Sequence, residues 1–179
     1  MADMTIEEFC ARHGACQEVR EWALANCQSM RDVWDTAKPQ WLMWVATRRG
    51  VLTERDLRLF TVRCARSVEH LMTDQRSRHA IVVGERFAFG NADADELAAA
   101  RQAAWDAMPA PSLGAYSACS VAWAATWHAS DEDAAWVAAR DAAQVASLDT
   151  AREQQAEWLR ELTPCFDREA VPDAAAAGE

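Results

Sequence analysis

Apolar or small side chains recur every three to four residues along most of this chain, with polar side chains between them. Clear examples lie within residues 57–71, 116–127 and 158–162; their members are Leu57, Phe60, Cys64, Val68, Leu71, Tyr116, Ser120, Trp123, Trp127, Trp158 and Leu162. This spacing places one face of an α-helix against a core. No segment alternates apolar and polar residues as a half-buried strand does, so the pattern predicts an all-α protein.

Helix starts are marked by residues that cap helix N-termini. Thr5 and Ser29 each precede an acidic residue by three positions, which is the spacing of a capping box. The same spacing recurs at Thr53, Asp93, Ser130 and Thr150, Pro39 suits a first helical turn, and Gly50, Gly90 and Gly114 suit helix ends or turns. These signals predict helices over residues 5–12, 15–27, 29–37, 39–49, 53–72, 75–89, 93–108, 113–129, 131–148 and 150–162.

The length of 179 residues suits one domain that buries its own core. We expect a single all-α domain over residues 1–171, with about 8–10 short-to-medium helices stacked as antiparallel helical hairpins. Residues 172–179 are expected to form a disordered tail.

The second half of the chain is rich in alanine, tryptophan and acid. Alanine favours helix and lets neighbouring helices approach, while tryptophan fills the gaps between them. The carboxylates of such helices would then face solvent, where they could contact a partner; the candidates are Asp106, Asp131, Glu132, Asp133 and Asp141. The alternative is that these acids only form a solvated face.

Charge is distributed unevenly along the chain. Residues 1–89 carry 13 basic and 12 acidic side chains, whereas residues 90–179 carry 5 and 16, which accounts for the net charge of −10. An acidic end opposes binding to nucleic acid or to an anionic membrane and favours a basic partner. The arginines of the first half are interleaved with acids, so they predict a mixed-charge surface that could also clamp carboxylates of the acidic half.

One cluster of possible metal ligands lies near the start of the chain. Cys10, His13 and Cys16, with Cys27 as a fourth ligand, offer soft donors for zinc. Their spacing is not that of a zinc finger or ribbon, and free cysteine is commonly a core residue. The favoured interpretation is buried helix residues and no metal.

Other patterns give enzyme chemistry little support. His70 and Asp74 lie four residues apart and could serve acid–base chemistry, but no nucleophile is marked beside them, so a charge network at a helix end is favoured. Residues 84–86 are too short for a phosphate loop, and the chain has no G-x-S-x-G elbow. The sequence predicts a protein that is not an enzyme and has no cofactor.

The start of the chain lacks the basic and apolar regions of a signal peptide, and no stretch is apolar enough for a membrane span. We therefore expect a cytoplasmic protein whose six cysteines are reduced. The single lysine, Lys38, among seventeen arginines suggests a GC-rich coding sequence, hence a bacterium or its phage.

Several runs resemble a family of immunity proteins found in bacteria and phages. They are residues 32–39 (DVWDTAKP), 41–46 (WLMWVA), 57–60 (LRLF), 64–66 (CAR), 70–77 (HLMTDQRS) and 85–88 (ERFA), followed by Gly90, residues 96–98 (ELA) and the Ala-Ala-Trp-Asp block. The similarity covers about residues 5–162, and residues 108–114 depart from it. The resemblance implies an all-α fold and neutralisation of a cognate toxin by direct binding.

Resemblance and charge together predict a non-enzymatic inhibitor that contacts a basic protein through an acidic helical surface. Its target would be a toxin, a nuclease or a CRISPR effector. One alternative is a phage-encoded inhibitor of a host defence complex, which would act as a nucleic-acid mimic of the anti-CRISPR type. A second is a self-associating structural protein, since Ala/Trp faces can bury against another copy in a homodimer.

Overall fold

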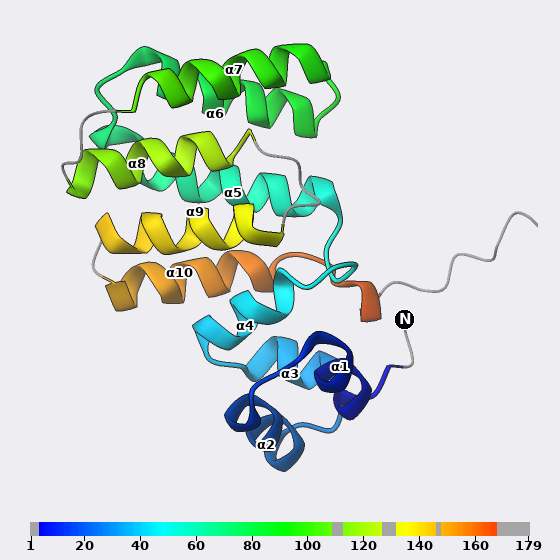
Figure 1. Ribbon diagram of the computed structural model, residues 1–179. Coiled ribbons are helices and arrows are strands. Elements are labelled where there is room, and N and C mark those ends of the chain that lie inside the picture. Colours follow the sequence, from blue (N-terminus) through cyan, green and yellow to red (C-terminus); the bar gives the residue numbers. More distant parts are fainter. Residues whose placement is uncertain (1–3, 109–112, 127–131, 146–147, 168–179) are drawn as a thin grey trace, which may run out of the picture.

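The computed structural model describes residues 4–108, 113–126, 132–145 and 148–167, and each of these stretches contains helix (Figure 1). In chain order the elements are α1 (Ile6–His13), α2 (Gln17–Asn26), α3 (Met30–Thr36), α4 (Pro39–Ala46), α5 (Glu54–Val68), the 3-10 helix η1 (Glu69–Leu71), α6 (Gln75–Ala88), α7 (Ala94–Asp106), α8 (Leu113–Ala124), α9 (Glu132–Val145), α10 (Leu148–Arg160) and the 3-10 helix η2 (Cys165–Asp167). No strand occurs in these stretches, so the predicted all-α class is confirmed.

The predicted caps explain where most helices of the first half begin. The side chains of Thr5 and Ser29 each accept a hydrogen bond from a backbone N–H three residues on, and the acid at that position bonds back to the cap. Thr53 and Asp93 accept equivalent bonds at 3.0 Å and 2.8 Å. Each bond satisfies a backbone donor that a helix start leaves unpaired, so the sequence fixes these starts locally.

The predicted helix start at Thr150 is wrong. Helix α10 begins at Leu148, so Thr150 lies inside its first turn instead of capping it. The predicted start at residue 113 is confirmed by α8, whose second residue is Gly114. Gly50 and Gly90 follow helices with left-handed backbone φ angles of 84° and 72°. The predicted start at Ser130 and the predicted tail over residues 172–179 lie outside the described residues.

The helices after α3 pack in successive layers (Figure 1). Helices α6 and α7 form one end, α5 and α8 follow, then α9 and α10, and α4 packs on α10; α1, α2 and α3 lie at the other end. One body of packed helices agrees with the expected single fold unit. The finer prediction of regularly stacked antiparallel hairpins stays a prediction.

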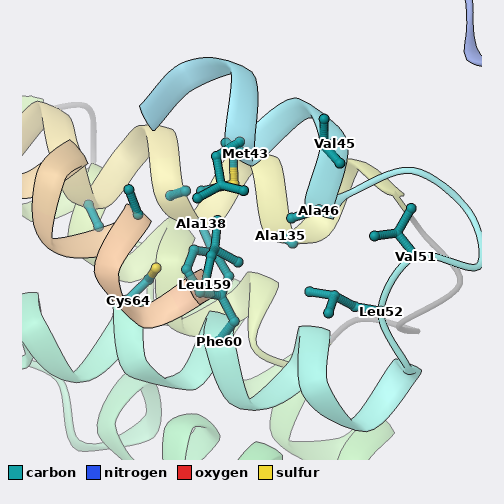
Figure 2. Close-up of a cluster of buried hydrophobic side chains, with 14 of the residues drawn as sticks. Met43, Val45, Ala46, Val51, Leu52, Phe60, Cys64, Ala135, Ala138 and Leu159 are labelled. Atoms are coloured by element: carbon teal, nitrogen blue, oxygen red, sulfur yellow. The ribbon is translucent and has the colours of Figure 1, made fainter. Parts of the chain in front are cut away.

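The main hydrophobic core extends from α1 to α10. Figure 2 shows its centre, where Met43 of α4, Phe60 of α5 and Leu159 of α10 meet the alanine-bearing face of α9. Ala135 and Ala138 are almost fully buried there. Because alanine has a small side chain, α9 approaches its neighbours closely and the larger side chains fill the remaining space.

Helix α7 is attached through a separate, smaller core. This cluster consists of Ala80, Val83, Leu97, Ala100 and Ala104, with Phe87, Ala92 and Trp123 packed against it. Most of its members are small, so α7 gains less from burial than the helices around the main core do. Helix α7 is therefore held mainly by small side chains, whereas α6 also contributes Ile81 to the main core.

The last described residues tie α3 to α10. The guanidinium of Arg160 donates a hydrogen bond to the carbonyl oxygen of Ala37 at 2.9 Å. Trp34 is fully buried and meets the ring of Phe166 edge-on at a centroid distance of 5.8 Å. The backbone N–H of Cys165 donates to a carbonyl between α4 and α5 at 2.7 Å. The N-terminal helices therefore complete their packing only against the C-terminal segment.

The start of α6 gives a prediction about pH. Asp74 caps this helix through the N–H of Arg76 at 2.8 Å, and hydrogen bonds from the side chain and then the backbone of Arg76 lower the pKa of Asp74 to about 2. A lowered carboxyl pKa contributes stability above the unfolded value, and that contribution is lost as pH falls toward the folded value. We expect Asp74→Ala to lower the melting temperature at about pH 6, and the difference from wild type to shrink as pH falls from about 4 to about 2.

The control for this experiment is Asp95→Ala, which removes an exposed carboxylate from the first turn of α7 without removing a cap. A melting-temperature difference for Asp74→Ala that is equally large at both ends of the pH range would contradict the assignment.

Candidate functional site

The five acids predicted to contact a partner differ in their surroundings. Asp106 is exposed at the end of α7, where its Oδ1 accepts a hydrogen bond from Nε2 of Gln102 at 2.9 Å. Glu132 and Asp133 belong to the first turn of α9. Their side chains and the whole of Asp131 lie outside the described part of the chain.

The expectation that Asp141 faces solvent is wrong. Its exposed fraction is only 5%, and its Oδ1 accepts a hydrogen bond from Nε of the adjacent Arg140 at 2.8 Å. The reason is that α9 packs against α8, α5 and α10, so few of its directions remain open to water. Asp141 is thus a buried, paired carboxylate rather than a surface contact.

The predicted acids also do not share one face. Helix α8 packs between α7 and α9, and it begins near the end of α7 while α9 begins near the opposite end of α8 (Figure 1). The twelve residues of α8 span about 18 Å, so Asp106 and the first turn of α9 lie toward opposite ends of α8. A partner that touched both groups would need to cover α8.

A surface hollow of about 370 Å³ lies beside Asp106, between α7 and α8. We call its four lining residues, Arg101, Gln102, Trp105 and Trp123, the tryptophan surface. Trp105 is 51% exposed, and its ring centroid lies 5.1 Å from that of Trp123, with the planes tilted by 45°. A large aromatic ring that is both exposed and held by a second ring is typical of protein-binding surfaces.

Carboxylates outnumber arginines along α7, although the charged residue that lines the hollow itself is Arg101. Helix α7 and its cap carry Asp93, Asp95, Glu96 and Asp106 against the single Arg101. Glu96 forms an ion pair with Arg86 of α6. The remaining field along α7 is therefore negative, as the sequence predicted for the second half.

Arginines of the first half do clamp carboxylates of the second. In addition to the Arg86–Glu96 pair, Nη1 of Arg63 lies 2.6 Å from Oε2 of Glu161. Both pairs are exposed, so each contributes little to stability. They neutralise acids near α6 and α10. Asp106 forms no ion pair with another described residue, although it lies close enough to Arg76 of α6 to add, after Asp74, to the raised pKa of that guanidinium.

Arg58 was predicted to lie on a mixed-charge surface, but it is buried. Its Nη1 donates to the carbonyl oxygen of Ala125 at 3.3 Å, and its guanidinium lies 4.8 Å from the ring centroid of Phe87. Burial lowers the pKa of Arg58. The cation therefore caps the C-terminal end of α8, where the partial charge of the helix is negative. The sequence does hold a signal for this burial, because Arg58 lies three and four residues before the buried Thr61 and Val62 and so shares their side of α5.

The interpretation of the cysteine and histidine cluster as buried helix residues is right for Cys10 and wrong for Cys16, which is exposed just before α2. Cys10 is buried, and burial raises the pKa of its thiol, whereas Cys16 is exposed beyond the left-handed turn at Gly14. His13 packs against Phe9 at a ring distance of 4.5 Å. Across the described ranges, no group of three or more His, Cys, Asp or Glu side chains is arranged to hold a metal.

His70 and Asp74, the possible acid–base pair, have different roles in the structure. Asp74 caps α6 and forms an ion pair with Arg76, while His70 is exposed in η1. The favoured interpretation of a charge network at a helix end agrees with this arrangement.

A second surface hollow crosses α5 between α6 and α10 and also measures about 370 Å³. Its aromatic side chains are the buried Phe60, Phe89, which is 53% exposed, and Trp158. Here the charges are balanced, because Arg66 pairs with Glu85 and Arg63 pairs with Glu161. This hollow is a neutral counterpart to the tryptophan surface and serves as its control below.

Comparison with protein-family models, with curated proteins and with solved structures found no match to this chain. The resemblance to bacterial and phage immunity proteins therefore stays a prediction. Within the described residues, no helix has the length and apolar character needed to cross a membrane.

Proposed function

We propose that this protein is a non-enzymatic binding protein that neutralises a basic partner protein by direct contact. The contact is made through the tryptophan surface and the acidic helix α7 beside it. The observation that carries the proposal is the half-exposed Trp105, held against Trp123 beside the exposed carboxylate of Asp106. An aromatic anchor supplies contact area, and the surrounding acids steer and select a positively charged partner.

The burial of Asp141 narrows the surface that the proposal uses. Asp106 remains as the described member of the predicted set, and Glu132 and Asp133 extend the acidic region by their positions in the first turn of α9. The target is a basic toxin, nuclease or nucleoprotein. A host defence complex blocked by a nucleic-acid mimic is a version of the same mechanism with a different target.

Trp105→Ala tests the contact. The tagged protein would be used to retain partners from a bacterial lysate, with and without phage infection, and the affinity of the retained partner would then be measured. Truncating a central aromatic anchor costs at least about 2 kcal/mol, which is about thirtyfold in affinity. We expect that loss for Trp105→Ala and a binding that weakens as salt rises.

Phe89→Ala is the matched control, because Phe89 has nearly the same exposed fraction but lies at the neutral hollow. Its affinity should equal that of wild type. Loss of binding in Phe89→Ala with full binding in Trp105→Ala would move the contact to α5 and overturn the proposal. Asp106→Lys tests the contribution of charge and should reduce both the affinity and its dependence on salt.

Self-association is the second candidate, because an exposed tryptophan can also bury against another copy of the chain. Sedimentation of the purified protein separates the two. A dimer that Trp105→Ala dissociates, with no basic protein retained from lysate, would favour the structural role.

A further inference from the structure

A small cavity lies between α4, α9 and α10, in different layers from the tryptophan surface (Figure 1). Its volume is about 50 Å³, and its apolar walls come from Pro39, Met43, Ala139 and Ala143. Figure 2 shows Met43 pointing from α4 into the space between α9 and α10. One water needs roughly 15 Å³ of such space, so the cavity admits a group of a few heavy atoms but not a nucleotide.

The charged side chains that line this cavity, among the described residues, are both arginines. The side chain of Arg140 is 51% exposed; its Nε donates to Asp141, and its terminal nitrogens make no hydrogen bond to another described residue. Arg152 is half-buried and makes no hydrogen bond or ion pair to any other described residue. The planar guanidinium of Arg152 therefore has free N–H donors, and a carboxylate is an anion whose geometry matches them.

Gln40 and Gln155 supply the uncharged polar groups of the lining. The side chain of Gln155 is buried, and its Nε2 donates to the carbonyl oxygen of Ala139 at 2.9 Å. This bond fixes the amide at the wall, as the Asp141 contact orients Nε of Arg140. The fold therefore positions these two groups, which lowers the entropy lost when a ligand binds.

We propose that this cavity binds a small free monocarboxylate with a short alkyl group. Arg152 supplies the positive charge that selects an anion, and Arg140, whose charge is offset by Asp141, adds further N–H donors. Charge-assisted hydrogen bonds from arginine suit carboxylate geometry. The apolar walls select the alkyl group and disfavour inorganic phosphate, which has no apolar part to bury. This site goes beyond the proposed function and does not depend on it, because its lining shares no residue with the tryptophan surface.

Propionate titration of protein labelled with ¹³C at the methionine methyl groups tests the proposal. Met43→Leu identifies the Met43 signal, and sodium chloride at equal ionic strength provides the reference. We expect a saturable shift of the Met43 methyl with propionate. Losing a charged hydrogen bond should weaken binding by about tenfold or more in Arg152→Gln, and less in Arg152→Lys.

Arg20→Gln is the matched control, since it removes one exposed arginine outside the cavity and should leave the affinity unchanged. Equal affinity for propionamide, a tighter saturable response to phosphate, or no response to propionate would each overturn the proposal. If Arg152→Gln does not give the spectrum of a folded protein, Arg152→Lys carries the test, and an affinity equal to that of wild type would overturn it.

Discussion

Leu159→Ala is expected to destabilise the protein by about 3–5 kcal/mol. Leu159 is fully buried at the meeting point of α4, α5, α9 and α10, where Figure 2 shows it beneath Met43 and beside Ala138. The alanines of α9 bring rigid backbone close on one side, so the surroundings have little freedom to collapse into the space that the change creates. Urea unfolding, with the midpoint and slope fitted separately, measures the loss.

Leu148→Ala is the control in the same helix, because Leu148 is 42% exposed at the first position of α10. Its cost should stay within about 1 kcal/mol. Similar losses at both positions would mean that the layer between α4 and α9 is loosely packed, contrary to the structure.

Gly84→Ala is expected to destabilise the protein by about 1–3 kcal/mol, although alanine is the better helix former by nearly 1 kcal/mol. A Cβ atom at Gly84 would lie 2.7 Å from the carbonyl oxygen of Ala125. The same oxygen accepts a hydrogen bond from Arg58, which limits its freedom to move away. Helices α6 and α8 would have to separate. Thermal and urea unfolding together measure the change.

Ala98→Gly, on the exposed face of α7, supplies the opposite comparison. There the glycine should be the less stable residue, by about 0.5–1 kcal/mol. If Gly84→Ala instead stabilises the protein, the close approach of α6 to Ala125 is wrong.

Local signals made the helices predictable, while burial in the second half depended on packing. A cap such as Thr5 or Asp93 acts on backbone within three residues, so the sequence alone identifies it. Asp141 is buried because three other helices surround α9, and no feature within its own helix records that. Alanine is equally suited to an exposed or a buried helix face, which removes the contrast on which such predictions depend.

Gly84 and Arg58 also have positions in the packing that were not predicted from the sequence. The sequence marks Gly84 only as part of a segment too short for a phosphate loop. In the structure Gly84 is the point at which α6 contacts the end of α8. Arg58 was grouped with surface arginines, although its position on α5 follows the buried side of that helix. The acidic excess, by contrast, follows from composition. Trp105 corrects the expectation that tryptophans fill the gaps between helices, because its ring is 51% exposed and only partly covered by Trp123.

The bond between Arg160 and Ala37 has a consequence for how the chain is made. The two residues are 123 positions apart, and the buried Trp34 needs Phe166 from the same late segment. At about 5–20 residues per second, a ribosome supplies that segment roughly 6–25 s after α3. During this interval the nascent N-terminal helices expose an apolar surface that the mature protein hides, so they are the part of the chain most exposed to chaperones and proteases during synthesis.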